Sequence, residues 1–274
     1  MMKPIDQYEK HGYSILRGFF DDEEISKLNK YVDCIYQKWL MENEAAIFED
    51  KLVNMNSLTS PEYFQQSHSR RIDFFELIAP QKLTKALESM FGYGIHFHNT
   101  QLFFNPSNGE RLPYWHRDMQ YSPIEDSVQS DEQNKMCSLH IRIPLIEEKG
   151  VEVVPGTHRR WDTKLERNVR FELDGHKNSE SLPNSELIDL IRGDILIFNA
   201  QMIHRGNYEL NSERKAFDIC VGKYHPLASN FLDPRVLPTD DEIGKIANNQ
   251  WYRLAREIQL TSQASKGALT RTTS

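Results

Sequence analysis

Between residues 95 and 226 the chain consists of short apolar or aromatic runs separated by clusters of glycine, proline, asparagine and aspartate. The runs are IHFHNTQLFF, CSLHIRIPLI, VEVVPG, DILIFNA and AFDICVGKY. Such runs between turn-forming residues are typical of β-strands, and several in succession indicate a sandwich or barrel. We therefore expect a mainly β core over about residues 95–226.

Helices are expected on both sides of this β region. The segment from Phe19 to Leu40 opens with acidic residues that can cap a helix and continues with apolar residues at near-helical spacing. Residues 80–91 begin with proline and end before two glycines, the pattern of a second helix. Residues 239–260 indicate a terminal helix and residues 261–274 a polar, flexible tail. Without repeats or linkers, the simplest interpretation is one domain over residues 1–260.

The composition argues against several classes of protein. A formal net charge of −7 does not suit a broadly basic surface that binds nucleic acid. No apolar run approaches the about 18 residues of a membrane span, and the scattered charges of residues 1–20 are unlike a signal peptide. Three widely spaced cysteines suit buried thiols better than disulfides. We expect a cytoplasmic protein that binds neither nucleic acid nor membranes; nothing in the sequence indicates an oligomeric state.

The stretch RLPYWHRDMQYSP, residues 111–123, contains a histidine and an aspartate two positions apart. In an extended strand, His116 and Asp118 point to the same side and can bind one metal ion together. The best candidate for a third ligand is His204, which follows the apolar run DILIFNA through a short turn. Two imidazoles and one carboxylate form the facial arrangement that non-haem Fe(II) oxygenases use, with open positions for a co-substrate and dioxygen.

A keto acid bound to iron through one end would project its far carboxylate away from the metal, and burial of that charge requires a fixed cation. Arg214, in the segment NSERKAF, follows His204 closely and stands at the start of another apolar run. The planar guanidinium fork matches a carboxylate. We therefore expect Arg214 to bind the co-substrate.

Several of these segments together resemble the phytanoyl-CoA dioxygenase family of Fe(II)- and 2-oxoglutarate-dependent oxygenases. The similar segments are YEKHGYSILRGFFDDEEISKL, WHRD, GVEVVPGTHRRW, GDILIFNAQMIHRG and ERKAF, and the resemblance extends over about residues 7–226. The turn from Pro155 to His158 makes it more specific than a His-x-Asp pair alone. The resemblance implies a double-stranded β-helix, or cupin-like jelly roll, with His116, Asp118 and His204 as catalytic iron ligands and Arg214 binding 2-oxoglutarate.

The chain departs from related oxygenases at one position. Residue 216, two after Arg214, is alanine, where oxygenases outside this family often have a hydroxyl residue that shares the carboxylate. A second contact to the co-substrate would have to come from another strand, with Thr100 and Asn99 as candidates. Halogenating relatives replace the metal-binding carboxylate with a small residue, whereas Asp118 is present here, which favours hydroxylation.

Other polar and aromatic residues near these segments leave two interpretations open. His140 and Arg142 share one face of SLHIRIPL and could line a substrate cavity or face solvent. Trp115, Gln120 and Tyr121 flank the proposed ligands and could shape a substrate pocket or pack in the core. The following cations could form a solvated loop or, within residues 158–175, a lid that attracts an anionic substrate: Arg159, Arg160, Lys164, Arg167 and Arg170.

Three further histidines offer weaker alternatives. His96 and His98 form a second same-face pair in GIHFHNTQL, which could bind zinc or copper or could simply pack within the sheet. They lack a nearby carboxylate at matching spacing, so packing is the better interpretation. His158 follows a turn, and we interpret it as structural.

The function predicted from these features is hydroxylation of a small molecule at an unactivated C–H bond. Fe(II), 2-oxoglutarate and dioxygen would take part, and succinate and CO2 would be released. A polar or anionic substrate is preferred because of the basic segment. The alternative is a metal-binding jelly roll without oxygenase activity, serving as a binding module.

Overall fold

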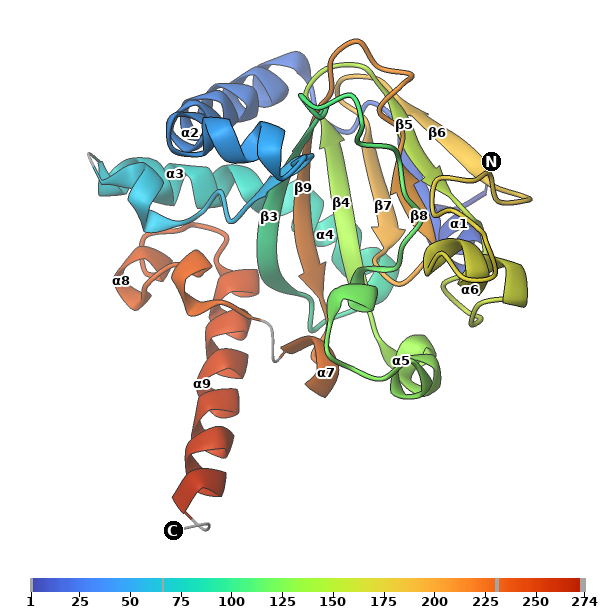
Figure 1. Ribbon diagram of the computed structural model, residues 1–274. Helices are drawn as coiled ribbons and strands as arrows, with labels where there is room; N and C mark the ends of the chain where they lie inside the picture. Colours follow the sequence, from blue (N-terminus) through green and yellow to red (C-terminus); the bar gives the residue numbers. More distant parts are fainter. Residues whose placement is uncertain (1, 66, 230–231, 272–274) are drawn as a thin grey trace. The chain divides into compact units, whose positions relative to one another are not determined.

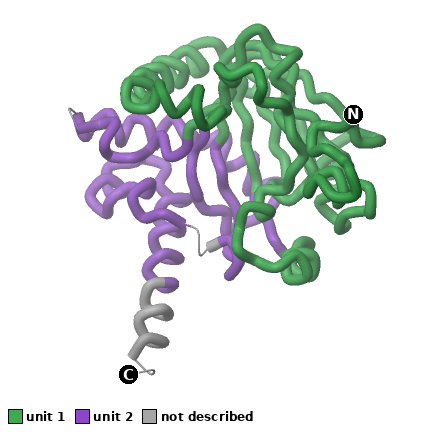
Figure 2. Tube along the Cα trace, in the orientation of Figure 1, with its two compact units in different colours: residues 1–55, 102–135, 139–218 green, residues 56–101, 136–138, 219–274 purple. Residues whose placement is uncertain are grey.

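The computed structural model describes residues 2–65, 67–229 and 232–271 (Figure 1). The chain divides into two compact units, each assembled from separate stretches of sequence (Figure 2). Unit 1 comprises residues 1–55, 102–135 and 139–218, and unit 2 comprises residues 56–101, 136–138 and 219–274. The prediction of one domain over residues 1–260 stays a prediction, and the two units are described separately.

The strands form two antiparallel sheets. The larger sheet has the order β1-β7-β4-β9-β3-β2 and the smaller sheet the order β6-β5-β8. The strands of the larger sheet are β1 (Tyr13–Leu16), β7 (Ile195–Asn199), β4 (Ser138–Pro144), β9 (Lys215–Gly222), β3 (His96–Phe104) and β2 (Asn54–Asn56). Those of the smaller sheet are β6 (Glu186–Leu190), β5 (Glu148–Val153) and β8 (His204–Gly206). All but β1 and β2 lie within the predicted β region of residues 95–226.

In unit 1 the two sheets share one hydrophobic core. Alternate residues of a strand point to the same face, so each sheet can contribute one apolar face. The buried cluster combines Tyr13, Leu196 and Phe198 of the larger sheet with Val151, Val153, Ile188 and Leu190 of the smaller sheet, and with Met202. The pairing of Val153 with His204 joins β5 to β8 and ties the segment that carries this histidine to the core.

Helix α2 (Asp22–Glu49) confirms the helix predicted from Phe19 to Leu40 and extends it by several residues. Asp21 and Glu24 form a reciprocal capping box at its first turn. The apolar residues Ile25, Leu28, Val32 and Ile35 are all buried. The other helices of unit 1 are α1 (Pro4–His11), η2 (Asp118–Tyr121), α5 (Asp126–Glu132), η3 (Gln133–Lys135) and α6 (Lys164–Arg170).

Outside its strands, unit 2 consists mainly of helices. Its helices are η1 (Pro61–Phe64), α3 (His68–Ile78), α4 (Gln81–Phe91), α7 (Pro226–Ser229), η4 (Pro234–Val236), α8 (Asp240–Ile243) and α9 (Gln250–Arg271). Helix α4 confirms the prediction for residues 80–91. It starts after Pro80 and is followed by the C-cap residue Gly92, whose φ of 72° favours glycine.

The C-terminal helix differs from the prediction in its interior and at its C-terminal end. Residues 239–260 are not one helix, because α8 ends at Ile243 and α9 starts only at Gln250. Asn249 donates a side-chain hydrogen bond to the carbonyl of Ile243 in the connection between them. Helix α9 then continues to Arg271, through most of the predicted tail, because extension of an existing helix costs far less than its nucleation. Residues 272–274 lie outside the described residues, and the flexibility of residues 261–274 stays a prediction.

Two predictions from composition can be compared with the described residues. None of the described helices combines the length and apolar character needed to cross a membrane. Cys34, Cys137 and Cys220 are all thiols without a disulfide, but each is partly exposed and not buried as predicted.

Acidification should destabilise the metal-free protein between pH 6.5 and pH 4. Burial lowers the pKa of His96 and of His158 to about 4, whereas a histidine in the unfolded chain has a pKa of about 6.5. The unfolded chain therefore binds more protons in this range, so stability is complete above pH 6.5 and falls as the pH falls. Each histidine contributes at most about 1.4 kcal/mol per pH unit.

Urea unfolding at pH 7 and at pH 5 measures this loss. His158→Gln should reduce the difference between the two free energies of unfolding, because one of the shifted groups is removed. Equal free energies for the unmodified protein at both pH values would contradict the prediction.

Candidate metal centre

His116 and Asp118 do not lie in a regular strand, contrary to the prediction. His116 forms an isolated antiparallel bridge with His204, in which each backbone N–H donates to the other residue's carbonyl at 3.0 Å. The chain then turns at Asp118 into the short helix η2, and the backbone N–H of Asp118 donates to the carbonyl of Ala200. The bridge thus joins His116 to the segment that carries His204, and the hydrogen bond from Asp118 to Ala200 holds the start of η2 against the same segment.

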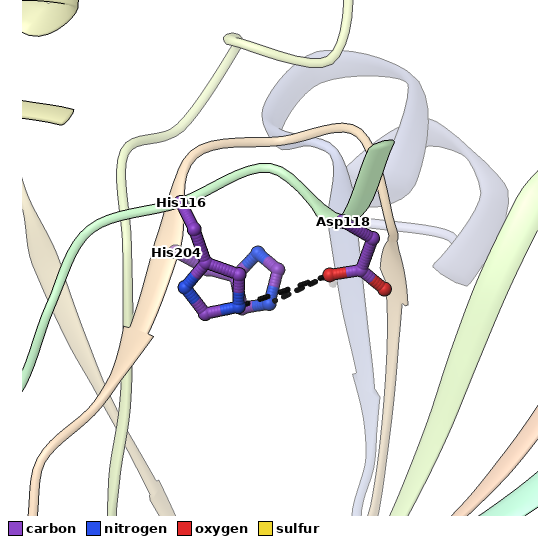
Figure 3. Close-up of side chains that lie close together, drawn as sticks. All are labelled: His116, Asp118 and His204. Carbon is purple, nitrogen blue, oxygen red and sulfur yellow. Dashed lines mark ion pairs between the residues drawn. The ribbon is translucent and has the colours of Figure 1, made fainter. Parts of the chain in front are cut away.

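The structure brings the side chains of His116, Asp118 and His204 together in unit 1 (Figure 3). One potential ligand atom from each residue lies within 4.8 Å of the others. Oδ1 of Asp118 lies 3.8 Å from Nε2 of His116 and 3.4 Å from Nε2 of His204. His116 and Asp118 are near neighbours in the sequence, whereas His204 is far from both, and the fold brings it to them.

Backbone carbonyls set the orientation of both imidazoles. Nδ1 of His116 lies 3.1 Å from the carbonyl oxygen of Tyr114, and Nδ1 of His204 lies 3.0 Å from that of Met202. A carbonyl can only accept, so Nδ1 carries the proton in each ring and Nε2 keeps its lone pair. Both lone pairs therefore face Asp118, as metal ligands require.

Burial and charge favour the protonation states that bind a metal. Burial lowers the pKa of His204 to about 3 and also lowers the pKa of His116. Burial alone would raise the pKa of Asp118, but the charge and hydrogen bond of His140 outweigh it and hold this pKa below its ordinary value. At neutral pH the cluster thus offers two neutral imidazoles and one carboxylate, a donor set that suits Fe(II) or another divalent transition metal.

His140 and Arg142 are buried, so the alternative that they face solvent is wrong. Nε2 of His140 lies 2.6 Å from Oδ2 of Asp118. Its Nδ1 lies 3.1 Å from Oδ2 of Asp218, and Arg142 donates to both oxygens of Asp218 at 2.8 and 3.0 Å. Asp218 was not among the residues predicted from the sequence, although a carboxylate within the apolar run AFDICVG was a usable signal, since buried carboxylates are nearly always paired.

Arg214 is buried and only partly satisfied by its surroundings. Its Nε donates to Oε1 of Glu148 at 2.5 Å. Its Nη1 and Nη2 have no hydrogen-bond partner among the described residues, nor does Oε2 of Glu148. A buried guanidinium with two unused nitrogens can bind an anion, so the residue fits the carboxylate-binding role expected of it. Glu148 was missed by the sequence analysis because it lies 66 residues from Arg214.

The space around Arg214 depends on a glycine and two aromatic rings. A Cβ at Gly206 would come within 2.8 Å of Nη1 of Arg214, so a side chain there would displace the guanidinium. The guanidinium carbon lies 5.4 Å from the ring centre of Phe103 and 5.7 Å from that of Tyr208. These contacts hold the arginine by its faces and leave its nitrogens available.

Thr100 and Asn99, the candidates for a second contact to the co-substrate, lie in unit 2. Oγ1 of Thr100 accepts a hydrogen bond from the backbone N–H of Leu58. The amide of Asn99 donates to Ser57 and accepts from the backbone N–H of Thr100. Their polar groups thus have partners within unit 2, and their role in binding the co-substrate stays a prediction.

The three residues that flank the proposed ligands have different surroundings. Trp115 is fully buried in a hydrophobic cluster and donates its indole N–H to the carbonyl of Glu180, which favours the core alternative. Gln120 accepts hydrogen bonds from Arg170 through its side-chain oxygen. Tyr121 is exposed, with its ring centre 5.7 Å from that of His116, and is the one of these three best placed to contact a substrate.

The cations of the basic segment are already paired with carboxylates. The pairs are Arg159–Glu9, Arg160–Glu166, Lys164–Asp174, Arg167–Asp126 and Arg170–Asp162. Part of the segment forms helix α6 behind a capping box at Thr163, so it is not simply a solvated loop. Pairing neutralises much of the charge that would attract an anion, and a lid over residues 158–175 stays a prediction.

The remaining histidines show no comparable cluster. In unit 2, Nε2 of His96 lies 3.1 Å from Nε2 of His98. Among the described residues, the one group of three or more metal-binding side chains is that of His116, Asp118 and His204, which favours packing for the pair. His158 is buried against Gly12, where a Cβ would approach its Nδ1 to 2.6 Å, and beside the ring of Tyr8. These contacts agree with a structural role.

The chain is similar to known proteins in sequence. The family profile described as phytanoyl-CoA dioxygenase (PhyH) matches residues 8–216. An ectoine dioxygenase from Sphingopyxis alaskensis is 22% identical over an alignment of 218 positions, and the match covers 73% of this chain and 68% of that protein.

Two solved structures are similar in fold. The non-haem α-ketoglutarate-dependent carbocyclase SnoK from nogalamycin biosynthesis superposes with a TM-score of 0.55 at 14% identity, over 81% of this chain and 84% of that one. HygX from Streptomyces hygroscopicus, with nickel and 2-oxoglutarate bound, gives a TM-score of 0.58 at 11% identity, over 81% and 87%. These likenesses confirm the predicted jelly-roll core with flanking helices.

His204→Ala should abolish divalent metal binding, because it removes one of three converging ligands. Substitution of residues that only hydrogen-bond to metal ligands typically lowers metal affinity about 10- to 100-fold. We expect a larger loss of Co(II) affinity when the ligand itself is removed. Titration followed by the visible absorption of Co(II) measures it. The control is His176→Ala, which removes a partly exposed histidine of the same unit that pairs with Glu180. Unchanged Co(II) affinity in His204→Ala would rule out this cluster as the metal site.

Proposed function

Because the chain belongs to the phytanoyl-CoA dioxygenase family, we propose that it is an Fe(II)- and 2-oxoglutarate-dependent dioxygenase that hydroxylates a small molecule at an unactivated C–H bond. The observation that carries the proposal is the combination, within unit 1, of the His116, Asp118 and His204 cluster with a buried guanidinium that has two unused nitrogens. Either feature alone would suit many proteins. Together they provide for a metal ion and for the carboxylate of a keto acid.

In this proposal each residue of the site has a defined task. His116, Asp118 and His204 hold Fe(II), and Arg214 binds the far carboxylate of 2-oxoglutarate through Nη1 and Nη2. Bound iron and 2-oxoglutarate supply the oxidising chemistry, in which dioxygen is consumed, succinate and CO2 are released and a hydroxyl group is added to the substrate. The protein contributes positions, fixed charges and exclusion of water.

A polar substrate is supported by the residues beside the metal cluster. The ring centre of Tyr114 lies 5.1 Å from that of His116, and the guanidinium of Arg111 lies 4.3 Å from the Tyr114 ring. With Tyr121, these groups provide phenol and guanidinium donors next to the proposed iron site. They replace the basic segment, whose charges are paired, as the reason to prefer a polar or anionic small molecule. We also propose a cytoplasmic location, since three thiols suit a reducing compartment.

The test is an aerobic assay with Fe(II) and 2-oxoglutarate, first without substrate and then with a library of small metabolites. We expect slow succinate formation and oxygen uptake that require both additions, and faster turnover with the correct substrate. Metal binding without any keto-acid binding would overturn the proposal in favour of the alternative, a metal-binding jelly roll without oxygenase activity.

Arg214→Ala should weaken binding of 2-oxoglutarate much more than binding of the metal. Loss of a buried charge pair costs about 2 kcal/mol or more, so we expect the dissociation constant of 2-oxoglutarate to rise at least about 30-fold. Arg214→Lys, which keeps the charge but not the fork, and Gly206→Ala, which displaces the guanidinium, should show smaller losses in the same direction.

Calorimetric titration of 2-oxoglutarate into the metal-loaded protein measures these effects. Arg160→Ala is the control, since Arg160 pairs with Glu166 and has no place in the proposed site. Equal affinities in Arg214→Ala and Arg160→Ala would remove Arg214 from the site.

A further inference from the structure

A continuous series of buried charged groups connects Asp118 to Arg214. His140 and Arg142 lie two positions apart on β4, and Asp218 lies on the neighbouring strand β9. Arg142, which binds Asp218, also pairs with Glu148, with Nη1 3.6 Å from Oε1. Glu148 in turn accepts a hydrogen bond from Arg214 at 2.5 Å. Negative and positive side chains alternate along the whole series. It therefore runs from the proposed metal ligand to the proposed keto-acid anchor.

His140 occupies the decisive position in this series. Its two ring nitrogens face Oδ2 of Asp118 at 2.6 Å and Oδ2 of Asp218 at 3.1 Å. Carboxylates only accept hydrogen bonds, so the ring donates from both sides. Its faces are fixed as well, because it stacks on Phe198 with ring centres 4.9 Å apart and an interplanar angle of 19°. The imidazole is therefore held in plane and in position.

The two oxygens of Asp118 are thereby assigned different partners. Oδ2 is engaged by His140, while Oδ1 faces Nε2 of both His116 and His204. Without His140, the carboxylate could rotate and present either oxygen, or both, to the imidazoles. A ligating carboxylate whose second oxygen is tied down has one defined orientation.

We propose that His140 is a positioning residue: it holds Asp118 so that only Oδ1 is presented to the metal, and Asp218, Arg142 and Glu148 hold His140 in register with Arg214. This inference rests on the proposed function, since it concerns the same metal site. Isolated charges in a protein interior are costly, and partners on both sides offset that cost. The series thus fixes Asp118 and Arg214 relative to one another before the metal or 2-oxoglutarate binds.

Two substitutions at His140 separate this role from a general structural one. The amide nitrogen of Gln reaches about as far as Nε2 of the imidazole, so His140→Gln can still donate to Asp118. The shorter Asn reaches only about as far as Nδ1, so His140→Asn can donate to Asp218 but not to Asp118. Both variants are polar, uncharged and similar in volume.

Co(II) titrations of the full chain, followed by visible absorption, distinguish them. We expect His140→Asn to bind Co(II) about 10- to 100-fold more weakly than the unmodified protein, with an altered absorption spectrum, and His140→Gln to restore most of the affinity and the spectrum. His158→Asn and His158→Gln are matched controls, because His158 is equally buried in the same unit, with 6% exposure against 5% for His140. These controls should leave Co(II) binding unchanged.

Equal Co(II) affinity and equal spectra in the Asn and Gln variants would overturn the inference. Weaker Co(II) binding in His140→Gln than in His140→Asn would overturn it as well. If His140→Asn does not fold, as judged by circular dichroism, His140→Phe takes its place, since it keeps the ring on Phe198 and removes both donors. Failure of the proposed function gives a different result. In that case His204→Ala would bind Co(II) as well as the unmodified protein does, whatever residue stands at position 140.

Discussion

The candidate site depends on one backbone interaction, the reciprocal pair of hydrogen bonds between His116 and His204. Each of these residues belongs to a segment that has no local reason to approach the other. The bridge extends the edge of β8, which itself pairs with β5 and so with the core of unit 1. Because the backbones are joined at the two histidines themselves, both imidazoles start from adjacent positions. Carbonyl groups then aim their Nε2 atoms at Asp118.

Around this bridge the protein buries an unusual amount of charge. Arg142, Glu148, Arg214 and Asp218 are each at most 3% exposed, and their surroundings are strands of apolar residues. Such groups are tolerated because acids and bases alternate and share hydrogen bonds. The series is incomplete at one end, where Arg214 keeps two unused nitrogens. An unsatisfied buried guanidinium is costly for stability, and binding of an anion would remove that cost.

Some features of the fold follow from the local sequence, and others do not. Helix α2 was predictable because its apolar residues repeat at helical spacing and its acidic start forms a local cap. The His-x-Asp pair was predictable as a pair but not in its conformation, since η2 starts at Asp118. The interruption between α8 and α9 was missed because the periodicity continues across it. His140 and Arg142 could not be assigned to a face, because both faces of β4 are buried and alternation then carries no information.

The sequence by itself determined the local properties of this protein: the strand-rich region, the capped helices, and the kinds of side chain that can bind a metal and a carboxylate. Only the tertiary structure decided which of these side chains meet. Glu148 reaches Arg214 across 66 residues and Asp218 reaches His140 across 78. The physical reason is that hydrogen bonds and ion pairs act over a few ångströms, whereas the order of the strands that brings such groups together follows from burial of apolar faces along the whole chain.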